Sequence, residues 1–166
     1  MAGQSLYPLA VGNSWTYRMK DGRTYTNAIF AENDGVFSAS DTLTQQVASI
    51  TRRGDELLVY RPEYGQWVVL LNDQPQPGDT WQYAYRANGV DTDLVHVVKN
   101  VGQAFEVEGK VYQDVMLVEA ESKMSMNGKP IPMQFFTQYY YARGVGLVLT
   151  TTSSGDAMPL VACELT

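Results

Sequence analysis

The chain contains one histidine, His96, and imidazole is the side chain that exchanges protons most readily near neutral pH. Asp91 and Asp93 precede it in DTDLVHVV, so this segment combines the side-chain types that ligate metals. Because residues two apart share one face of a strand, both aspartates would lie opposite His96. A shared metal ion would need a bend there. The pattern favours a packed, hydrogen-bonded histidine after a solvated strand start.

Paired carboxylates are the other groups with catalytic chemistry. Glu119 and Glu121 in VEAES share a face, as the acid and base of a glycosidase would. A hydrolase built on Glu119, Glu121 or His96 would need these groups to converge in a cleft. The sequence has no Gly-x-Ser-x-Gly elbow, no Gly-rich phosphate loop and no Cys-x-x-Cys pair. We therefore expect no catalytic residues, no metal and no cofactor.

Aromatic side chains offer a better functional surface. Tyr139, Tyr140 and Tyr141 are consecutive, so on a strand at least one ring must point away from the others. Such a ring lines a cavity, covers a neighbour or forms an apolar patch that suits a partner or a sugar. Ordinary packing on both faces of the sheet is the alternative interpretation.

Methionines around the Asn-Gly turn at 127–128 could form an adaptable contact hairpin, although Met also fills gaps in cores. The residues expected to contact a ligand or partner are Tyr139, Tyr140, Tyr141, Met124, Met126 and Met133.

The elements that must position these residues are strands. Eleven Tyr, three Trp, 14 Gly and 7 Pro fit pleated surfaces joined by tight turns. Turn signals such as KDGR, NDG, ANG and NGK separate β-branched runs, which predicts an antiparallel meander with little helix. Segment 40–53 places Leu43, Val47 and Ile50 on one helical face, but its Thr and Val content favours a strand.

A short motif occurs twice, as GNSWTY at 12–17 and GDTWQY at 78–83. Its glycine and Asn or Asp suit a turn with a left-handed residue, and Trp and Tyr then share a strand face. We expect Trp15 and Trp81 to be mostly buried and to open strands. Gly144 and Gly146 predict a reversal or bulge in which at least one glycine has positive φ or lies against another strand.

Residues 1–166 are expected to form a single β domain, a barrel or a strongly curved sheet. The repeat divides the chain into comparable stretches, about 7–73 and 75–152. These are either two related halves from duplication or one barrel entered twice from the same rim.

Four segments carry a resemblance to a known group: LYPLAVGNSWTYR, QPGDTWQY, VEGKVYQDVMLVEAES and YYYARGVGLVLT. In this order they resemble a group of bacterial, mostly exported or lipoprotein-type β-rich proteins of unassigned function. The resemblance spans Leu6 to about Thr152 and implies an extracytoplasmic domain, which is periplasmic, attached to the outer membrane or secreted. It supplies no catalytic residues. The sequence departs from the group in two features. Its hairpin KMSMNGKPIPMQFFTQ is extended, and we expect no signal peptide in its first residues.

The net charge of −6 and the absence of a basic cluster beyond Arg52-Arg53 predict no nucleic-acid partner. No apolar run is long enough for a membrane span. We therefore expect a non-catalytic binding or interaction module of a bacterial cell-envelope or secreted protein. Its partner would be a protein, a glycan or an apolar small molecule. The alternative is a lipocalin-like or lipoprotein-carrier-like binder of apolar ligands, whose cavity Trp, Tyr and Met would line.

Overall fold

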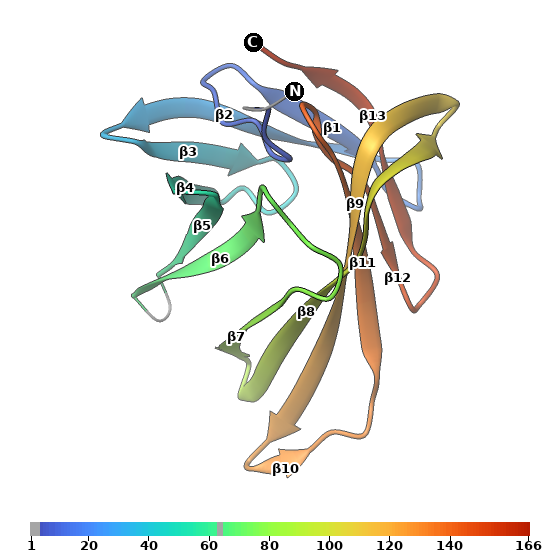
Figure 1. The fold of residues 1–166 in the computed structure, drawn as a ribbon. Helices are drawn as coiled ribbons and strands as arrows, with labels where there is room; N and C mark the ends of the chain where they lie inside the picture. Colours follow the sequence, from blue (N-terminus) through green and yellow to red (C-terminus); the bar gives the residue numbers. More distant parts are fainter. Residues whose placement is uncertain (1–3, 63–64) are drawn as a thin grey trace.

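The computed structural model describes residues 4–62 and 65–166, and its regular elements are all strands (Figure 1). Segment 40–53 forms the end of one strand, a turn and the next strand, as its composition favours. The strands are β1 (Ser14–Arg18), β2 (Thr24–Asn33), β3 (Val36–Asp41), β4 (Val47–Arg53), β5 (Glu56–Arg61), β6 (Gln66–Asn72), β7 (Thr80–Ala87), β8 (Val90–Val107), β9 (Lys110–Met126), β10 (Lys129–Pro130), β11 (Phe135–Ala142), β12 (Gly146–Thr152) and β13 (Ala157–Glu164).

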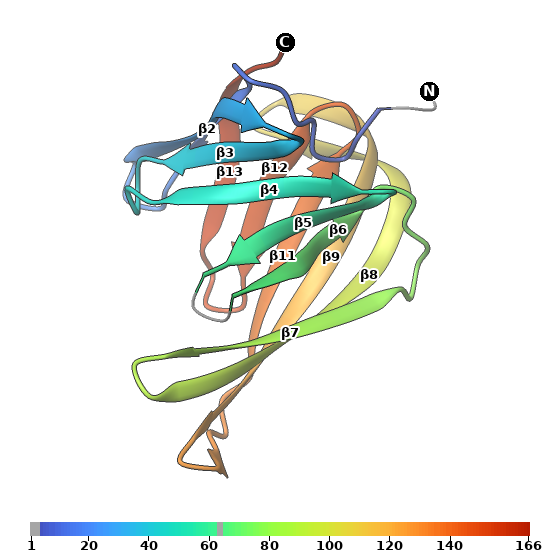
Figure 2. The ribbon, with the colours of Figure 1, turned by 90° about the vertical axis from the view of Figure 1, so that its left-hand side faces the viewer.

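The strands form one antiparallel meander that closes almost completely into a barrel. Their order in the sheet is β6-β5-β4-β3-β2-β1-β13-β12-β11-β9-β8-β7, and the short β10 pairs with β9 outside this path. The first and last strands pair with each other, so the ends of the sheet, β6 and β7, come from the middle of the chain (Figure 2). The prediction of an all-β antiparallel barrel or strongly curved sheet is confirmed.

The first copy of the repeated motif begins with a type II turn. The Asn13 amide donates to the Ala10 carbonyl at 3.1 Å, and Gly12 has a φ of +100° at the third position of the turn. The Gly12 amide then donates to the Ile29 carbonyl at 2.8 Å, and the Ile29 amide donates to the Asn13 carbonyl at 2.9 Å. This pair of bonds sets the register of β1 against β2.

The second copy repeats these bonds. The Asp79 amide donates to the Gln76 carbonyl at 3.0 Å, and Gly78 has a φ of +94°. Pro77 suits the second position of the turn because its ring fixes φ near the required value. The Gly78 amide donates to the Val98 carbonyl at 2.8 Å, and the Val98 amide donates to the Asp79 carbonyl at 2.9 Å. The motif therefore starts β7 against β8 as it starts β1 against β2.

The core lies inside the barrel and includes Trp15, which is 1% exposed. Its indole N–H donates to the Val145 carbonyl at 2.7 Å, and the Tyr17 hydroxyl donates to the Leu147 carbonyl at 2.8 Å. Gly146 lies against this indole, since a Cβ built on it would be 2.9 Å from the Trp15 Nε1. Gly144 and Gly146 have φ values of +80° and +116°, which confirms the prediction for this segment.

The loop between β6 and β7 is fixed by Asp73, which is buried. Its carboxylate accepts hydrogen bonds from the Leu6 amide at 2.9 Å and from the Ser5 hydroxyl at 3.0 Å, and it pairs with Arg52. Arg143 donates to the Asp73 carbonyl at 3.0 Å. These contacts fix the position of the end of β6, and therefore the position of the gap between β6 and β7.

Strands β1 to β6 lie within 7–73 and β7 to β12 within 75–152, while β13 follows both stretches. The single domain and its two related halves remain a prediction.

Candidate ligand-binding cleft

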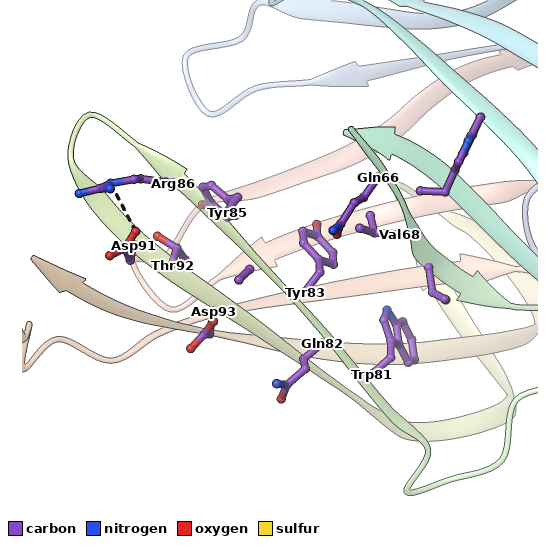
Figure 3. A pocket seen from close by; sticks show the side chains of 13 residues that line it. Gln66, Val68, Trp81, Gln82, Tyr83, Tyr85, Arg86, Asp91, Thr92 and Asp93 are labelled. Atoms are coloured by element: carbon purple, nitrogen blue, oxygen red, sulfur yellow. Dashed lines mark ion pairs between the residues drawn. The ribbon is translucent and has the colours of Figure 1, made fainter. Parts of the chain in front are cut away.

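A cleft of about 680 Å³ lies at the break between β6 and β7. This volume is in the range of small-molecule sites. Figure 3 shows residues of β6, β7 and the start of β8 around it. The lining residues are Gln66, Trp67, Val68, Val69, Trp81, Gln82, Tyr83, Ala84, Tyr85, Arg86, Asp91, Thr92 and Asp93.

Strand β7 turns its aromatic side chains toward this space. Trp81, Tyr83 and Tyr85 alternate along the strand and are each partly buried, whereas Gln82 between them is exposed. In Figure 3 the three rings lie on the side of β7 that faces β6, and Gln82 points away. Alternation in a strand therefore gives the cleft an aromatic wall.

His96 completes this wall from β8. It lies directly opposite Trp81 in the antiparallel pair and is 7% exposed. The imidazole stacks on the Trp81 indole with 5.0 Å between centroids and an interplanar angle of 3°, and lies 5.5 Å from the Tyr83 ring. Burial lowers the pKa of His96 below its usual value, which favours the neutral imidazole.

Arg61, at the end of β5, brings a positive charge to the aromatic wall. Its guanidinium lies 5.3 Å from the Tyr83 ring centroid and donates to the Tyr83 hydroxyl at 3.1 Å. Within residues 4–62 and 65–166, Arg61 has no carboxylate in ion-pairing distance. The contact with Tyr83 therefore combines a cation–π interaction with a hydrogen bond.

Buried polar atoms without a hydrogen-bond partner concentrate here. In the described part of the chain they are Arg61 Nε, Trp81 Nε1 and His96 Nδ1. Trp81 stacks on His96, and Arg61 and His96 both contact the Tyr83 ring. Native proteins leave few such atoms unpaired, and each one calls for an explanation. Their grouping beside one cleft marks the region as a candidate binding site.

The three tyrosines predicted as a contact surface separate onto two faces of β11. Tyr139 and Tyr141 point into the barrel, with their rings 6.4 Å apart. Burial raises the pKa of Tyr139 to about 12, with smaller contributions from Tyr83 and Tyr85. Tyr140 lies on the other face and stacks on Phe105 at 4.5 Å. Tyr139 and Tyr141 thus lie on the same face as Tyr83 of the cleft, and Tyr140 does not.

The predicted methionines also occupy different environments. Met124 is partly buried and pairs in register with Thr92, which lines the cleft. Met126 and Met133 are 46% and 61% exposed and belong to the hairpin around β10. This hairpin projects beyond the body of the barrel (Figures 1 and 2). The structure therefore does not gather the tyrosines and methionines into one surface.

The ionisable residues considered for catalysis do not converge. Glu119 accepts a hydrogen bond from the Gln138 amide at 2.9 Å and lies 3.8 Å from the Lys99 ammonium. It alternates with Ala120, the register partner of His96, so Glu119 and Glu121 lie on the face of β9 opposite to His96.

The aspartates that precede His96 are exposed, and Asp91 pairs with Arg86 at 3.4 Å. Within residues 4–62 and 65–166 no three His, Cys, Asp or Glu residues are grouped to hold a metal ion.

Sequence reasoning missed the cleft and Arg61. The prediction that Trp81 opens a strand and is mostly buried is confirmed, since it packs against the core, but its place beside a cleft was not expected. No local pattern pointed to Arg61, because Leu57, Leu58 and Val59 before it are all buried and alternation does not assign it to one face of β5.

Comparison with solved structures supports the fold. A protein from Bacteroides fragilis, described as exported and as having a YmcC-like fold, superposes with a TM-score of 0.61 at 9% identity, over 98% of this chain and 100% of that chain. A protein from Parabacteroides distasonis, described as a lipoprotein, gives 0.60 at 9% identity, over 99% and 100%. No protein-family model matches the sequence, and no curated protein matches it significantly. The similarity shows a shared all-β fold.

Among residues 4–62 and 65–166, no helix has the length and apolar character needed to cross a membrane.

Proposed function

We propose that this protein is a non-catalytic binding protein of the bacterial cell envelope or of a secreted fraction, and that it binds an apolar small molecule between β6 and β7. The observation that carries this proposal is the cleft of about 680 Å³, whose aromatic wall stands at the break in the barrel. Concave, mostly aromatic spaces with few polar groups are typical of ligand sites.

The arrangement of side chains favours binding over catalysis. His96 is buried against Trp81, and the carboxylates of Glu119 and Glu121 lie on the other face of the sheet. No described nucleophile and base lie within hydrogen-bond reach of each other in the cleft, as covalent catalysis requires. The extracytoplasmic location is supported by the two structural neighbours, which are described as an exported protein and a lipoprotein.

A neutral apolar dye, N-phenyl-1-naphthylamine, tests this proposal. We expect its fluorescence to rise on binding and intrinsic tryptophan fluorescence to change, because Trp67 and Trp81 both line the cleft. Dye affinity should fall at least about tenfold in the double variant Trp67→Ala/Tyr85→Ala, which removes two rings. Phe30→Ala, which alters an aromatic residue 53% exposed on β2, is the matched control.

Two outcomes would contradict the proposal. If the folded protein does not bind the dye, it has no apolar site of the proposed kind. If the double variant binds the dye with unchanged affinity, the site does not lie in this cleft. Met126→Ala then tests the hairpin directly, because Met126 is exposed there. The protein should also show no turnover of ester, glycoside, peptide or phosphate substrates. Turnover abolished by His96→Ala or Glu119→Gln in folded protein would establish an enzyme instead.

A further inference from the structure

We infer that the ligand of the cleft is an apolar molecule with one carboxylate group, and that the guanidinium of Arg61 binds this carboxylate. The inference rests on the proposed function and specifies the chemical class of its ligand. It depends on three observations: the ion pairing of the arginines, the type of the unpartnered polar atoms, and their arrangement around Tyr83.

Arg61 differs from every other arginine of this acidic protein. In the described part of the chain each of the others lies in an ion pair, and Arg61 does not. The paired arginines are Arg18, Arg23, Arg52, Arg53, Arg86 and Arg143. With a net charge of −6, carboxylates are plentiful, so a guanidinium that contacts Tyr83 of the cleft and has no ion-pair partner within residues 4–62 and 65–166 needs a cause.

The unpartnered atoms call for a ligand that accepts hydrogen bonds. Arg61 Nε and Trp81 Nε1 each carry a hydrogen that can only be donated, and both atoms are buried without an acceptor. His96 Nδ1 can donate or accept according to its tautomer. A carboxylate presents two acceptor oxygens and matches the planar fork of a guanidinium.

The arrangement explains how a charged group and an apolar body fit one site. Arg61 lies 5.3 Å from the centroid of the Tyr83 ring, and His96 lies 5.5 Å from the same ring. Asp91 and Asp93 also line the cleft, and its apolar lining includes Trp81, Tyr85 and, on β6, Val68. A carboxylate near Arg61 would leave the apolar remainder of the ligand against these side chains.

Other charge types fit this site less well. A cationic ligand would find aromatic faces and the carboxylates of Asp91 and Asp93, but beside Tyr83 it would meet the positive charge of Arg61, which has no ion-pair partner among the described residues. A neutral apolar ligand would cover Arg61 and remove it from water without giving it a partner, which costs free energy. The carboxylate satisfies both the charge and the hydrogen-bond donors.

The test displaces N-phenyl-1-naphthylamine with three ligands that share a tail: dodecanoate, methyl dodecanoate and dodecyltrimethylammonium. The wild-type protein should bind dodecanoate at least about tenfold more tightly than the ester, as expected for a charge-assisted hydrogen-bonded pair. Dodecyltrimethylammonium should bind no more tightly than the ester. Arg61→Gln should abolish the preference for dodecanoate over the ester. Affinity for the ester should not fall, because the substitution removes the charge that a neutral ligand would have to cover.

Arg86→Gln is the matched control. Arg86 itself lines the cleft, whereas Arg61 contacts the lining residue Tyr83. The Arg86 side chain is 60% exposed and pairs with Asp91. This variant should keep the preference for dodecanoate, since a screened surface pair contributes little. Arg61→Lys retains the charge without the planar fork and should keep a reduced preference.

Equal affinity of the wild type for dodecanoate and its ester would overturn the inference, and this comparison needs no variant to fold. A preference that survives in folded Arg61→Gln would overturn the role of Arg61. If the dye and the ester bind but dodecanoate is not preferred, apolar-ligand binding is supported and carboxylate recognition is refuted. Failure of the dye and all three ligands to bind would refute both proposals.

Discussion

The two copies of the Gly-[Asn/Asp]-[Ser/Thr]-Trp-x-Tyr motif begin alike and end in different environments. Their turn and register hydrogen bonds agree within 0.1 Å. Trp15 of the first copy is 1% exposed and donates to the Val145 carbonyl. Trp81 of the second copy is partly buried and its N–H has no acceptor. The motif therefore determines how a strand starts, and the surrounding sheet determines what its aromatic residues do.

The position of each strand in the sheet explains the difference. Strand β1 lies between β2 and β13, so it is paired with a neighbouring strand on each side. Val145, which precedes β12, and Leu147, within β12, supply their carbonyls to Trp15 and Tyr17. Strand β7 is an edge with no partner on the β6 side, and Trp81 and Tyr83 line the cleft there instead. An aromatic pair that completes a core in one place thus lines a cleft where the sheet ends.

Replacing each tryptophan by alanine should give the largest difference between the copies. Trp15→Ala should lower the free energy of unfolding by about 3–5 kcal/mol, because it empties a packed site and leaves the Val145 carbonyl without its donor. Trp81→Ala should cost less than half as much, because its indole is only partly buried and has no hydrogen bond to lose. Urea denaturation followed by circular dichroism measures both values.

Equal costs for the two substitutions would contradict the comparison. Phe30→Ala, on the exposed face of β2, serves as the control and should change stability little.

A glycine of the second copy, Gly78, and a glycine that packs against Trp15 of the first copy, Gly146, separate the effect of conformational strain from that of steric contact. At Gly78, φ is +94° and a Cβ would meet no atom within 4 Å, so Gly78→Ala should cost about 1–2 kcal/mol from conformation alone. At Gly146, φ is +116° and a Cβ would lie 2.9 Å from the Trp15 indole nitrogen. Gly146→Ala should reach about 3 kcal/mol, since strain and displacement of the indole combine. Thermal and urea unfolding measure the two variants, and a smaller cost at Gly146 would show that Trp15 can move aside.

The fold was largely predictable because its signals are local. Alternating apolar and polar residues, Gly-containing turns and short spacings predict an antiparallel meander, and 140–149 show the expected reversal with its glycines. The repeat predicted two strand starts, and both occur. These features depend on a few neighbouring residues, so one sequence is sufficient to find them.

The cleft was not predictable because it depends on which strands fail to pair. Nothing local to β6 or β7 shows that the barrel stays open between them, while the first and last strands pair. The unequal environments of Trp15 and Trp81 follow from this long-range arrangement. The three consecutive tyrosines were visible in the sequence, but nothing in it indicated that Tyr139 and Tyr141 would approach Tyr83 of β7 while Tyr140 packs on Phe105.

The tyrosine hydroxyls offer a smaller test of the comparison. Tyr17→Phe should cost about 1 kcal/mol, because the buried Leu147 carbonyl loses its donor at 2.8 Å. Tyr83→Phe should change stability less, since its hydroxyl accepts from the partly exposed Arg61 at 3.1 Å. It should instead alter affinity for the ligands of the cleft. Paired denaturation and dye-displacement curves check this, and a larger stability loss in Tyr83→Phe would indicate that Arg61 is structural.

The residue opposite each tryptophan gives the smallest expected effect, a dependence of stability on pH. Trp15 pairs across the ladder with Asn27, whereas Trp81 pairs with His96. Burial holds the pKa of His96 in the folded state below the value of about 6.5 that it has in the unfolded chain. Below pH 6.5 the unfolded state therefore binds more protons, and the free energy of unfolding falls as pH decreases.

His96→Asn converts the pair at Trp81 into the pair found at Trp15 and removes this titration. The melting temperature of the wild type should fall more steeply than that of His96→Asn between pH 7 and pH 5, while the two curves run parallel above pH 7. All other ionisable groups are common to both proteins, so the difference between the curves isolates His96. Asn27→His in the first copy is the converse variant, and burial beside Trp15 should introduce a fall in the same direction. Parallel curves at every pH would mean that His96 titrates as it does in the unfolded chain, and that the wall of the cleft admits the proton.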